Sequence, residues 1–243
     1  MAVSVDTVYQ RVLGILNKEQ RGYVTAQEFN LFANQAQRDL FEQYFYDINQ
    51  FGRLHGNDTE YSDMLTMLDQ KVSPFKTSAS LVYDSTNAHF DLPSDLYRLG
   101  SVVYSNTTTD GFGTTTTDLI EAERVNQNEL LYINLSPLTK PVNTRPIYTQ
   151  NTSGINVYGN SELTTNVTCN YVRTPAKVQW AYQIVFNEPL YDAANSVNFE
   201  LDPSEETELV IKILELSGLL IKDFNMYNAI NQEEIETIQQ EKS

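Results

Sequence analysis

The sequence predicts an α+β protein in which N-terminal helices and a long C-terminal helix form a helical bundle, with a middle antiparallel β-rich region. Three observations predict this class. Apolar residues recur with helical spacing in residues 1–72, and short alternating runs separated by turn residues fill residues 73–198. An apolar stretch behind a helix-start signal occupies residues 199–224, and a polar tail follows over residues 225–243.

The N-terminal part carries three helix signals, the third being the apolar residues Tyr61, Met64, Leu65 and Leu68. The first is a run of apolar residues at a period of 3.6 that begins at Val5. The second is a capping box, in which the side chains of Thr25 and Glu28 can each satisfy a backbone N–H at the helix start. We therefore expect helices over Val5–Leu16, from the capping box to Phe51, and over Glu60–Gln70.

The middle part alternates between apolar and polar residues over short distances, as half-buried strands do. Most of these runs are expected to form an antiparallel sheet. The expected strands are Ser80–Asp84, His89–Leu92, Ser101–Ser105, Asp118–Val125, Ile147–Gln150, Gly154–Tyr158 and Asn166–Val172.

Three segments interrupt these strands. Pro93 starts a short turn that carries Leu96, Tyr97 and Leu99. The low-complexity run NTTTDGFGTTTT, residues 106–117, predicts an exposed mobile loop. A helical turn is expected over residues 126–134.

The last helix has a strong start signal. Asp202 can serve as the N-cap, and Pro203 fits the first helical position because that position needs no N–H donor. Acidic residues at Glu205, Glu206 and Glu208 complement the positive end of the helix dipole.

Most of the circumference of this helix is apolar, which requires burial on most sides. Either the rest of the chain or another subunit could provide that burial. The residues that would then face another subunit are Leu209, Val210, Ile213, Leu214, Leu220 and Ile221. The tail after this helix has little to bury, so a partner would have to order it.

A second candidate interface lies at the end of the strand over residues 166–172. It comprises Tyr171, Arg173 and Trp180, three residue types that often anchor protein interfaces. The same residues could instead maintain the fold, with the Arg173 guanidinium stacked on an aromatic ring and Pro175 ending the strand. We favour the structural role, with an interface as a secondary one.

The charge of the chain limits its partners. The 243 residues carry a formal net charge of −16. This charge opposes general binding to nucleic acid and to anionic membranes, because both need Lys and Arg. It suits a surface along which DNA slides without sticking. The chain has one cysteine, Cys169, so no intrachain disulfide is possible; it shows no signal peptide and no apolar run long enough to span a bilayer.

No motif for catalysis is present, and we expect no enzyme activity, no cofactor and no metal. The two histidines, His55 and His89, have no metal-binding or nucleophile motif around them, and nothing local pairs either with Cys169. Neighbouring acids such as Glu121 with Glu123, or Glu205 with Glu206, are expected to be solvated.

Five segments resemble the head-to-tail connector, or adaptor, proteins of short-tailed bacteriophages. The resemblance is closest to the ring proteins of crAss-like phages and to tail tubular A-type adaptors. It lies in architecture rather than in catalytic motifs and covers nearly the whole chain. The segments are VYQRVLGILNKEQRGYVTAQEFNLFANQAQRDLFEQYF from Val8, FDLPSDLYRLGSVVY from Phe90, RPIYT with INVYG from Arg145, NYVRTPAKVQW from Asn170 and DPSEETELVIKILELSGLLIKD from Asp202.

The resemblance implies a structural virion protein without enzymatic activity. It would form a dodecameric homo-oligomeric ring that binds the portal protein, connects it to the tail or to adjacent ring proteins, and lines the genome channel without sequence-specific DNA binding. The ring would be assembled in the host cytoplasm and would lie at the portal vertex of the virion. Residues 106–117 and 232–243 would reach the neighbouring rings.

Two other functions stay open at this point. A host-recognition or capsid decoration protein would use the Tyr-, Asn- and Thr-rich β region to bind glycans. A cell-wall hydrolase of the entry apparatus is the weaker alternative, because the sequence contains no visible active site.

Overall fold

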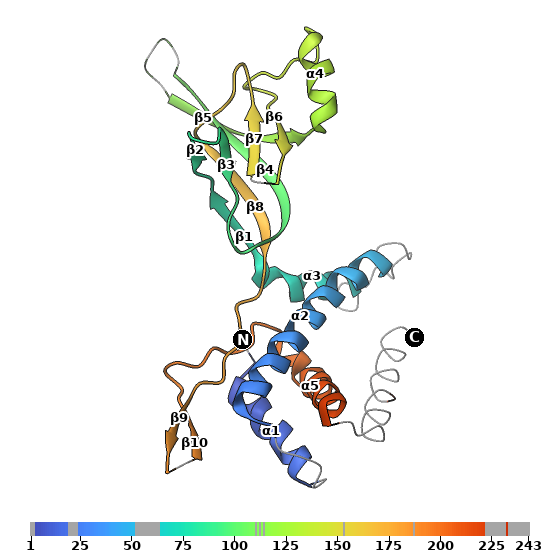
Figure 1. Cartoon of the computed structure of the whole chain (residues 1–243). Coiled ribbons are helices and arrows are strands. Elements are labelled where there is room, and N and C mark those ends of the chain that lie inside the picture. The colour runs from blue at the N-terminus through green and yellow to red at the C-terminus, as the bar shows by residue number, and fades with distance from the viewer. Residues whose placement is uncertain are drawn as a thin grey trace. The chain divides into compact units, whose positions relative to one another are not determined.

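The computed structural model describes residues 3–18, 24–51, 64–109, 111, 113, 115–152, 154–186, 188–221 and 232. It confirms the α+β class: along the sequence, helices occupy the parts near both ends and strands occupy the middle (Figure 1). The chain divides into two compact units, Met1–Pro74 with Pro175–Ser243, called here the helical unit, and Phe75–Thr174, the β unit. Residues 175–198, grouped with the strands in the sequence-based division, therefore belong to the helical unit.

The helical unit contains four helices and a small hairpin among the described residues. α1 and α2 confirm the first two expected helices, and α3 is described from Met64 onwards. The hairpin of β9 and β10 was not expected from the sequence. The elements are α1 (Val5–Lys18), α2 (Ala26–Phe51), α3 (Met64–Val72), a 3-10 turn (Pro203–Glu205), α5 (Glu206–Ile221), β9 (Tyr182–Val185) and β10 (Glu188–Tyr191).

Both predicted helix starts have the expected hydrogen bonds. The Thr25 backbone N–H donates to Glu28 Oε2 at 2.8 Å, and the Glu28 N–H donates back to Thr25 Oγ1 at 3.3 Å. This bonding lowers the pKa of the Glu28 carboxyl. Asp202 caps the last helical segment by accepting the Ser204 N–H at 3.0 Å, with Pro203 in the first turn.

α2 packs against α3 and α5, and α1 also packs against α5. The buried face of α2 follows the apolar stripe seen in the sequence, including Phe29, Ala33, Leu40 and Phe41. Burying one such large side chain contributes about 1.5–3 kcal/mol, so this face supplies much of the stability of the unit. No helix among the described residues is long and apolar enough to cross a membrane.

The β unit is built on one sheet in the order β1-β8-β4-β5-β6-β7-β3-β2. The β5–β6 pair is parallel and the other pairs are antiparallel, so the sheet is mixed but largely antiparallel. Its elements are β1 (Lys76–Ser80), β2 (Tyr83–Asp84), β3 (His89–Asp91), β4 (Leu96–Thr109), β5 (Thr115–Arg124), β6 (Ile147–Gln150), β7 (Gly154–Tyr158) and β8 (Val167–Arg173), with α4 (Gln127–Leu135) between β5 and β6.

The sheet curls until its two ends meet. β1 pairs with β8 at one end of the strand order and β2 pairs with β3 at the other, yet only Leu81 and Val82 separate β1 from β2. The Leu81 N–H bonds to Val167 O at 2.9 Å, and Val82 O accepts the Asp91 N–H at 3.1 Å. One continuous segment therefore belongs to both ends of the sheet.

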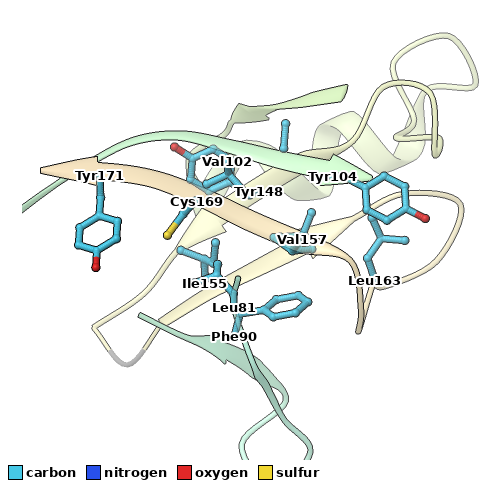
Figure 2. Packing of buried hydrophobic residues seen from close by; sticks show 12 residues of the cluster. Leu81, Phe90, Val102, Tyr104, Tyr148, Ile155, Val157, Leu163, Cys169 and Tyr171 are labelled. Carbon is cyan, nitrogen blue, oxygen red and sulfur yellow. The ribbon is translucent and has the colours of Figure 1, made fainter. Parts of the chain in front are cut away.

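The curled sheet encloses a single apolar cluster. Figure 2 shows Val102 from β4 and Cys169 from β8 packed in the same cluster as Ile155 from β7 and Phe90 from β3. All four side chains are fully buried. Strands that are distant in the sheet order thus share one core, which is possible only because the sheet curls.

Two sequence-based expectations about the β unit were wrong. Leu96–Gly100 is the start of β4 and not a turn, and it pairs with β8 through register shifts. Within residues 106–117, strand β4 continues to Thr109 and β5 begins at Thr115, so the described ends of this segment form a hairpin. Threonine is β-branched and favours extended backbone, which outweighs the loop character suggested by low complexity.

Candidate interaction surfaces

The predicted interface on the last helix is largely covered within the chain. The side chains of Leu209, Val210, Ile213 and Leu214 are buried inside the helical unit. The apolar circumference of α5 at these positions is therefore satisfied by the chain's own packing. The side chains of Leu220 and Ile221 lie outside the described residues, as does the predicted tail apart from Gln232.

Trp180 is a central residue of the helical unit. Its indole Nε1 donates to Asp6 Oδ1 at 3.0 Å, and its ring lies 4.2 Å from the ring of Tyr9, centroid to centroid. The rings of Tyr182 in β9 and Tyr191 in β10 stack on it at 5.8 Å. Trp180 thus ties the base of the β9–β10 hairpin to α1, which is the structural role expected for it.

Three amide side chains on α2 hold the chain segment that carries Trp180. Asn34 donates to Val178 O at 2.8 Å and accepts the Val178 N–H at 2.9 Å. Asn30 makes the equivalent pair with the backbone of Trp180, accepting its N–H at 2.7 Å and donating to its carbonyl at 3.2 Å. Gln37 donates to Ala176 O at 2.8 Å. A helix face thus bonds an extended backbone much as a neighbouring strand would.

Tyr171 and Arg173 both have partners inside the β unit. The Tyr171 hydroxyl donates to Asp95 Oδ1 at 3.0 Å. The Arg173 guanidinium lies 5.7 Å from the centroid of the Phe75 ring, so Phe75 is the aromatic partner expected for it. Both contacts contribute to the fold at the end of β8.

The sequence-based expectation for Glu205 was wrong. Its side chain is buried at 4% exposure and forms an ion pair with Lys71 of α3, rather than lying in water at the helix start. Burial, followed by the negative charges of Glu205 and Glu208, raises the pKa of the neighbouring Tyr44 above its usual value.

The β9–β10 hairpin exposes apolar side chains to solvent on both of its faces and at its turn. Ile184 is 72% exposed, Phe186 is 99% exposed and Leu190 is 62% exposed. Phe186 also has a φ of 51°, a left-handed conformation that costs a bulky residue energy. A fully exposed aromatic ring held in a strained backbone at a hairpin end suits a contact with another molecule better than it suits folding.

A second exposed apolar surface lies on α4 of the β unit. This helix has no buried residue. Leu131, Tyr132 and Leu135 are all largely exposed, as is Leu138 just after the helix. The spacing of Leu131, Tyr132 and Leu135 places them on one side of the helix, where they form a patch of the kind that partners cover.

The β4–β5 hairpin carries a ladder of threonines. The hydroxyl oxygens of Thr108 and Thr116 lie 3.0 Å apart, and those of Thr107 and Thr117 lie 3.4 Å apart. Thr109 and Thr115 form a third pair at 3.4 Å. These exposed pairs stiffen a hairpin that extends beyond the apolar core of the β unit.

The structure describes most of the side chains considered for catalysis. The Cys169 side chain is fully buried, and burial raises the pKa of its thiol, which keeps it protonated and unreactive. Glu121 and Glu123 are exposed on β5. His55 lies outside the described residues, and His89 is held within the β2–β3 hairpin.

Comparison with protein-family models and with curated proteins gives no match for this chain.

Proposed function

We propose that this chain is the subunit of a ring, a dodecameric homo-oligomer, that connects the capsid portal to the tail of a short-tailed bacteriophage. The observation that carries the proposal is the exposed apolar end of the β9–β10 hairpin. Phe186 at the turn and Ile184 close to it give this end an apolar character that water does not favour.

The hairpin suits a contact between copies of the chain. A two-stranded hairpin has little stability of its own, and this one is held at its base by stacking on Trp180. Its end meets no apolar cover among the described residues, since Phe186 is almost fully exposed. Contact with a different face of the next copy is heterologous, and heterologous contacts close into rings when the rotation permits.

The charge supports a genome channel. With a net charge of −16, copies arranged in a ring surround the channel with negative charge. Such a surface repels the DNA phosphates and lets the genome pass without sequence-specific binding. The portal and the next tail or ring protein are the other proposed partners, and the apolar side of α4 is a candidate surface for one of them. The site of action is the portal vertex of the virion, after assembly in the host cytoplasm.

Imaging tests the proposal directly. Tagged protein is recovered from infected cells and viewed end-on by negative-stain electron microscopy. We expect rings with a central hole, attached to a portal or tail, from which the copy number can be counted. Copies spread over capsid faces or on fibres would instead support the host-recognition or decoration function, and unattached monomers would contradict the ring.

A further inference from the structure

The β2–β3 hairpin brings one imidazole and two carboxylates together. Asp84 ends β2, and His89 and Asp91 lie in β3. One oxygen or nitrogen of each side chain lies within 4.8 Å of the others. We propose that these three side chains bind a divalent transition-metal ion, with Zn²⁺ the best fit. The proposal goes beyond the ring function and does not depend on it.

The hydrogen bonding of His89 defines what its two ring nitrogens can do. The ring is 9% exposed, and its Nδ1 lies 3.2 Å from the backbone carbonyl of Asn87. A carbonyl only accepts hydrogen bonds, so Nδ1 carries the proton. In the neutral ring, Nε2 then directs its lone pair at the Asp91 carboxylate, 3.2 Å away. A cation, either a proton on Nε2 or a metal ion, therefore has to lie between these two electron-rich atoms.

A metal ion satisfies this arrangement. Metal-bound histidines usually donate their other ring N–H to a carbonyl or carboxylate, as His89 does to Asn87. Zinc bonds to histidine nitrogen and carboxylate oxygen measure about 2.0–2.1 Å, which puts neighbouring ligand atoms of a tetrahedron roughly 3.3 Å apart. The separation of 3.2 Å between His89 Nε2 and Asp91 Oδ1 matches that edge. Asp84 supplies the third ligand, and water completes an open site.

Charge favours a dication over a proton. Two ionised carboxylates leave a charge of −2 beside a neutral imidazole. A proton on His89 would neutralise half of this charge of −2, whereas a divalent ion neutralises all of the charge. The chain as a whole carries a net charge of −16, so the surrounding field also attracts cations.

The hairpin is organised before any ion arrives. The carboxylate of Asp84 accepts the Thr86 N–H at 2.8 Å and the Asn87 side-chain N–H at 2.6 Å. The side chain of Asn156 on β7 donates to the carbonyl of Ala88, which fixes the loop from a neighbouring strand. These bonds hold the ligands in place and so reduce the entropy that binding would otherwise cost.

Glycine at position 154 is part of the same arrangement. A Cβ there would overlap the Phe90 carbonyl oxygen and lie 2.5 Å from His89 Cδ2. The absence of a side chain lets β7 lie directly against β3 and support the imidazole ring. The ion would then connect β2 to β3. The ladder between β2 and β3 has two residue pairs, and so does the ladder between β3 and β7.

Titration of the full chain tests the site. The protein is freed of metal with a chelator, and Zn²⁺ binding is followed by calorimetry, with Co²⁺ absorption as a report on coordination. We expect one ion per chain and a higher melting temperature with Zn²⁺. His89→Gln and Asp91→Asn should each weaken binding by more than the roughly 10–100-fold that loss of an outer-shell partner causes.

Matched controls separate this site from adventitious binding. His55→Gln removes the other histidine, and Asp118→Asn removes an exposed carboxylate of the same unit. Both should bind Zn²⁺ as the unmodified chain does. Equal binding by His89→Gln, or no stoichiometric binding by the unmodified chain, overturns the proposal and leaves a protonated His89 paired with Asp91.

A spectroscopic measurement needs no variant and covers the case in which substitution unfolds the hairpin. Histidine side-chain ¹⁵N spectra of the unmodified chain are recorded with and without Zn²⁺. The Nε2 resonance of His89 should shift as metal binds while its Nδ1 stays protonated. A shift confined to His55, or no shift at all, counts against the site.

Discussion

Lys71 of α3 forms an ion pair with the buried carboxylate of Glu205, and its ammonium also lies 5.7 Å from the centroid of the Tyr44 ring. The three residues come from α3, the 3-10 turn before α5, and α2. One cationic group therefore links three helical segments. The pair also explains how an acidic residue at a helix start can be buried.

Replacing Lys71 with methionine should destabilise the helical unit. The variant leaves the Glu205 charge buried without its partner, and breaking a buried pair in this way costs about 3–5 kcal/mol. Since Lys71 is partly exposed, we expect the low end of that range. Urea denaturation measures the change. Lys71→Met combined with Glu205→Leu should recover part of the loss, and a double variant less stable than Lys71→Met alone would contradict the explanation.

Asn34→Ala tests the bonding between α2 and the Val178 backbone. The substitution removes the partners of one N–H and one carbonyl at a residue that is buried. Each unsatisfied buried group costs about 1–3 kcal/mol, so the loss from the two groups should be about 2–6 kcal/mol by chemical denaturation. In Asn34→Asp the carboxylate still accepts the Val178 N–H but repels the Val178 carbonyl. The stability of this variant should lie between that of the unmodified chain and that of Asn34→Ala.

Asn49→Ala is the matched control on the same helix. The Asn49 side chain is exposed and, among the described residues, bonds to the carbonyl of Phe45 one turn back in α2. Its loss should change stability by no more than about 0.5 kcal/mol. Equal losses at the two positions would mean that the bonds of Asn34 contribute no more than helix propensity does.

Elements that neighbouring residues encode were predicted correctly, whereas contacts between residues far apart in the sequence were not. The helix beginning at the Thr25 capping box and the strands Ile147–Gln150 and Gly154–Tyr158 are encoded by neighbouring residues, and each was correctly predicted. The role of Asn34 was not predicted, because its partner is 144 residues away. On the sequence alone, an amide on a helix simply belongs to a solvated face.

The interaction surfaces were predicted less well for the same reason. An apolar helix was the strongest sequence signal, yet Leu209 and Ile213 are buried by the chain itself. The exposed end of β9–β10 was missed, since Ile184 and Phe186 resemble ordinary core residues in the sequence. The His89 cluster has no spacing motif because a hairpin, and not a helix, brings its donors together.

Acid should weaken the fold through carboxylates that are hydrogen-bonded in the native state. Hydrogen bonds lower the pKa of Glu28 through the Thr25 backbone, of Asp192 through the side chain of Asn195 and of Asp202 through the Ser204 backbone. A lowered native pKa gives stability that is fully present above the unfolded value of about 4. This stability is lost as the pH falls through the lowered pKa values that these three carboxyl groups have in the folded protein.

Denaturation between pH 7 and pH 2 measures this effect. The variant Glu28→Gln, Asp192→Asn, Asp202→Asn keeps hydrogen-bond acceptors without the charges. It should lose less stability than the unmodified chain as the pH drops below about 4. Asp118→Asn serves as the control for removal of an exposed negative charge. If the triple variant and the unmodified chain lose stability in parallel, these three carboxylates do not cause the acid sensitivity.

Phe186→Asn tests the contact proposed between copies. Asparagine tolerates the positive φ of this position, so the hairpin backbone is kept while the exposed ring is removed. Because Phe186 is 99% exposed, the melting temperature should hardly change. Ring formation by electron microscopy or native mass spectrometry should be lost or strongly reduced. Leu31→Asn, at a similarly exposed apolar residue on α2, should leave rings intact. Normal rings from Phe186→Asn would move the contact between copies away from the hairpin, because a central aromatic anchor usually supplies a large share of the binding free energy.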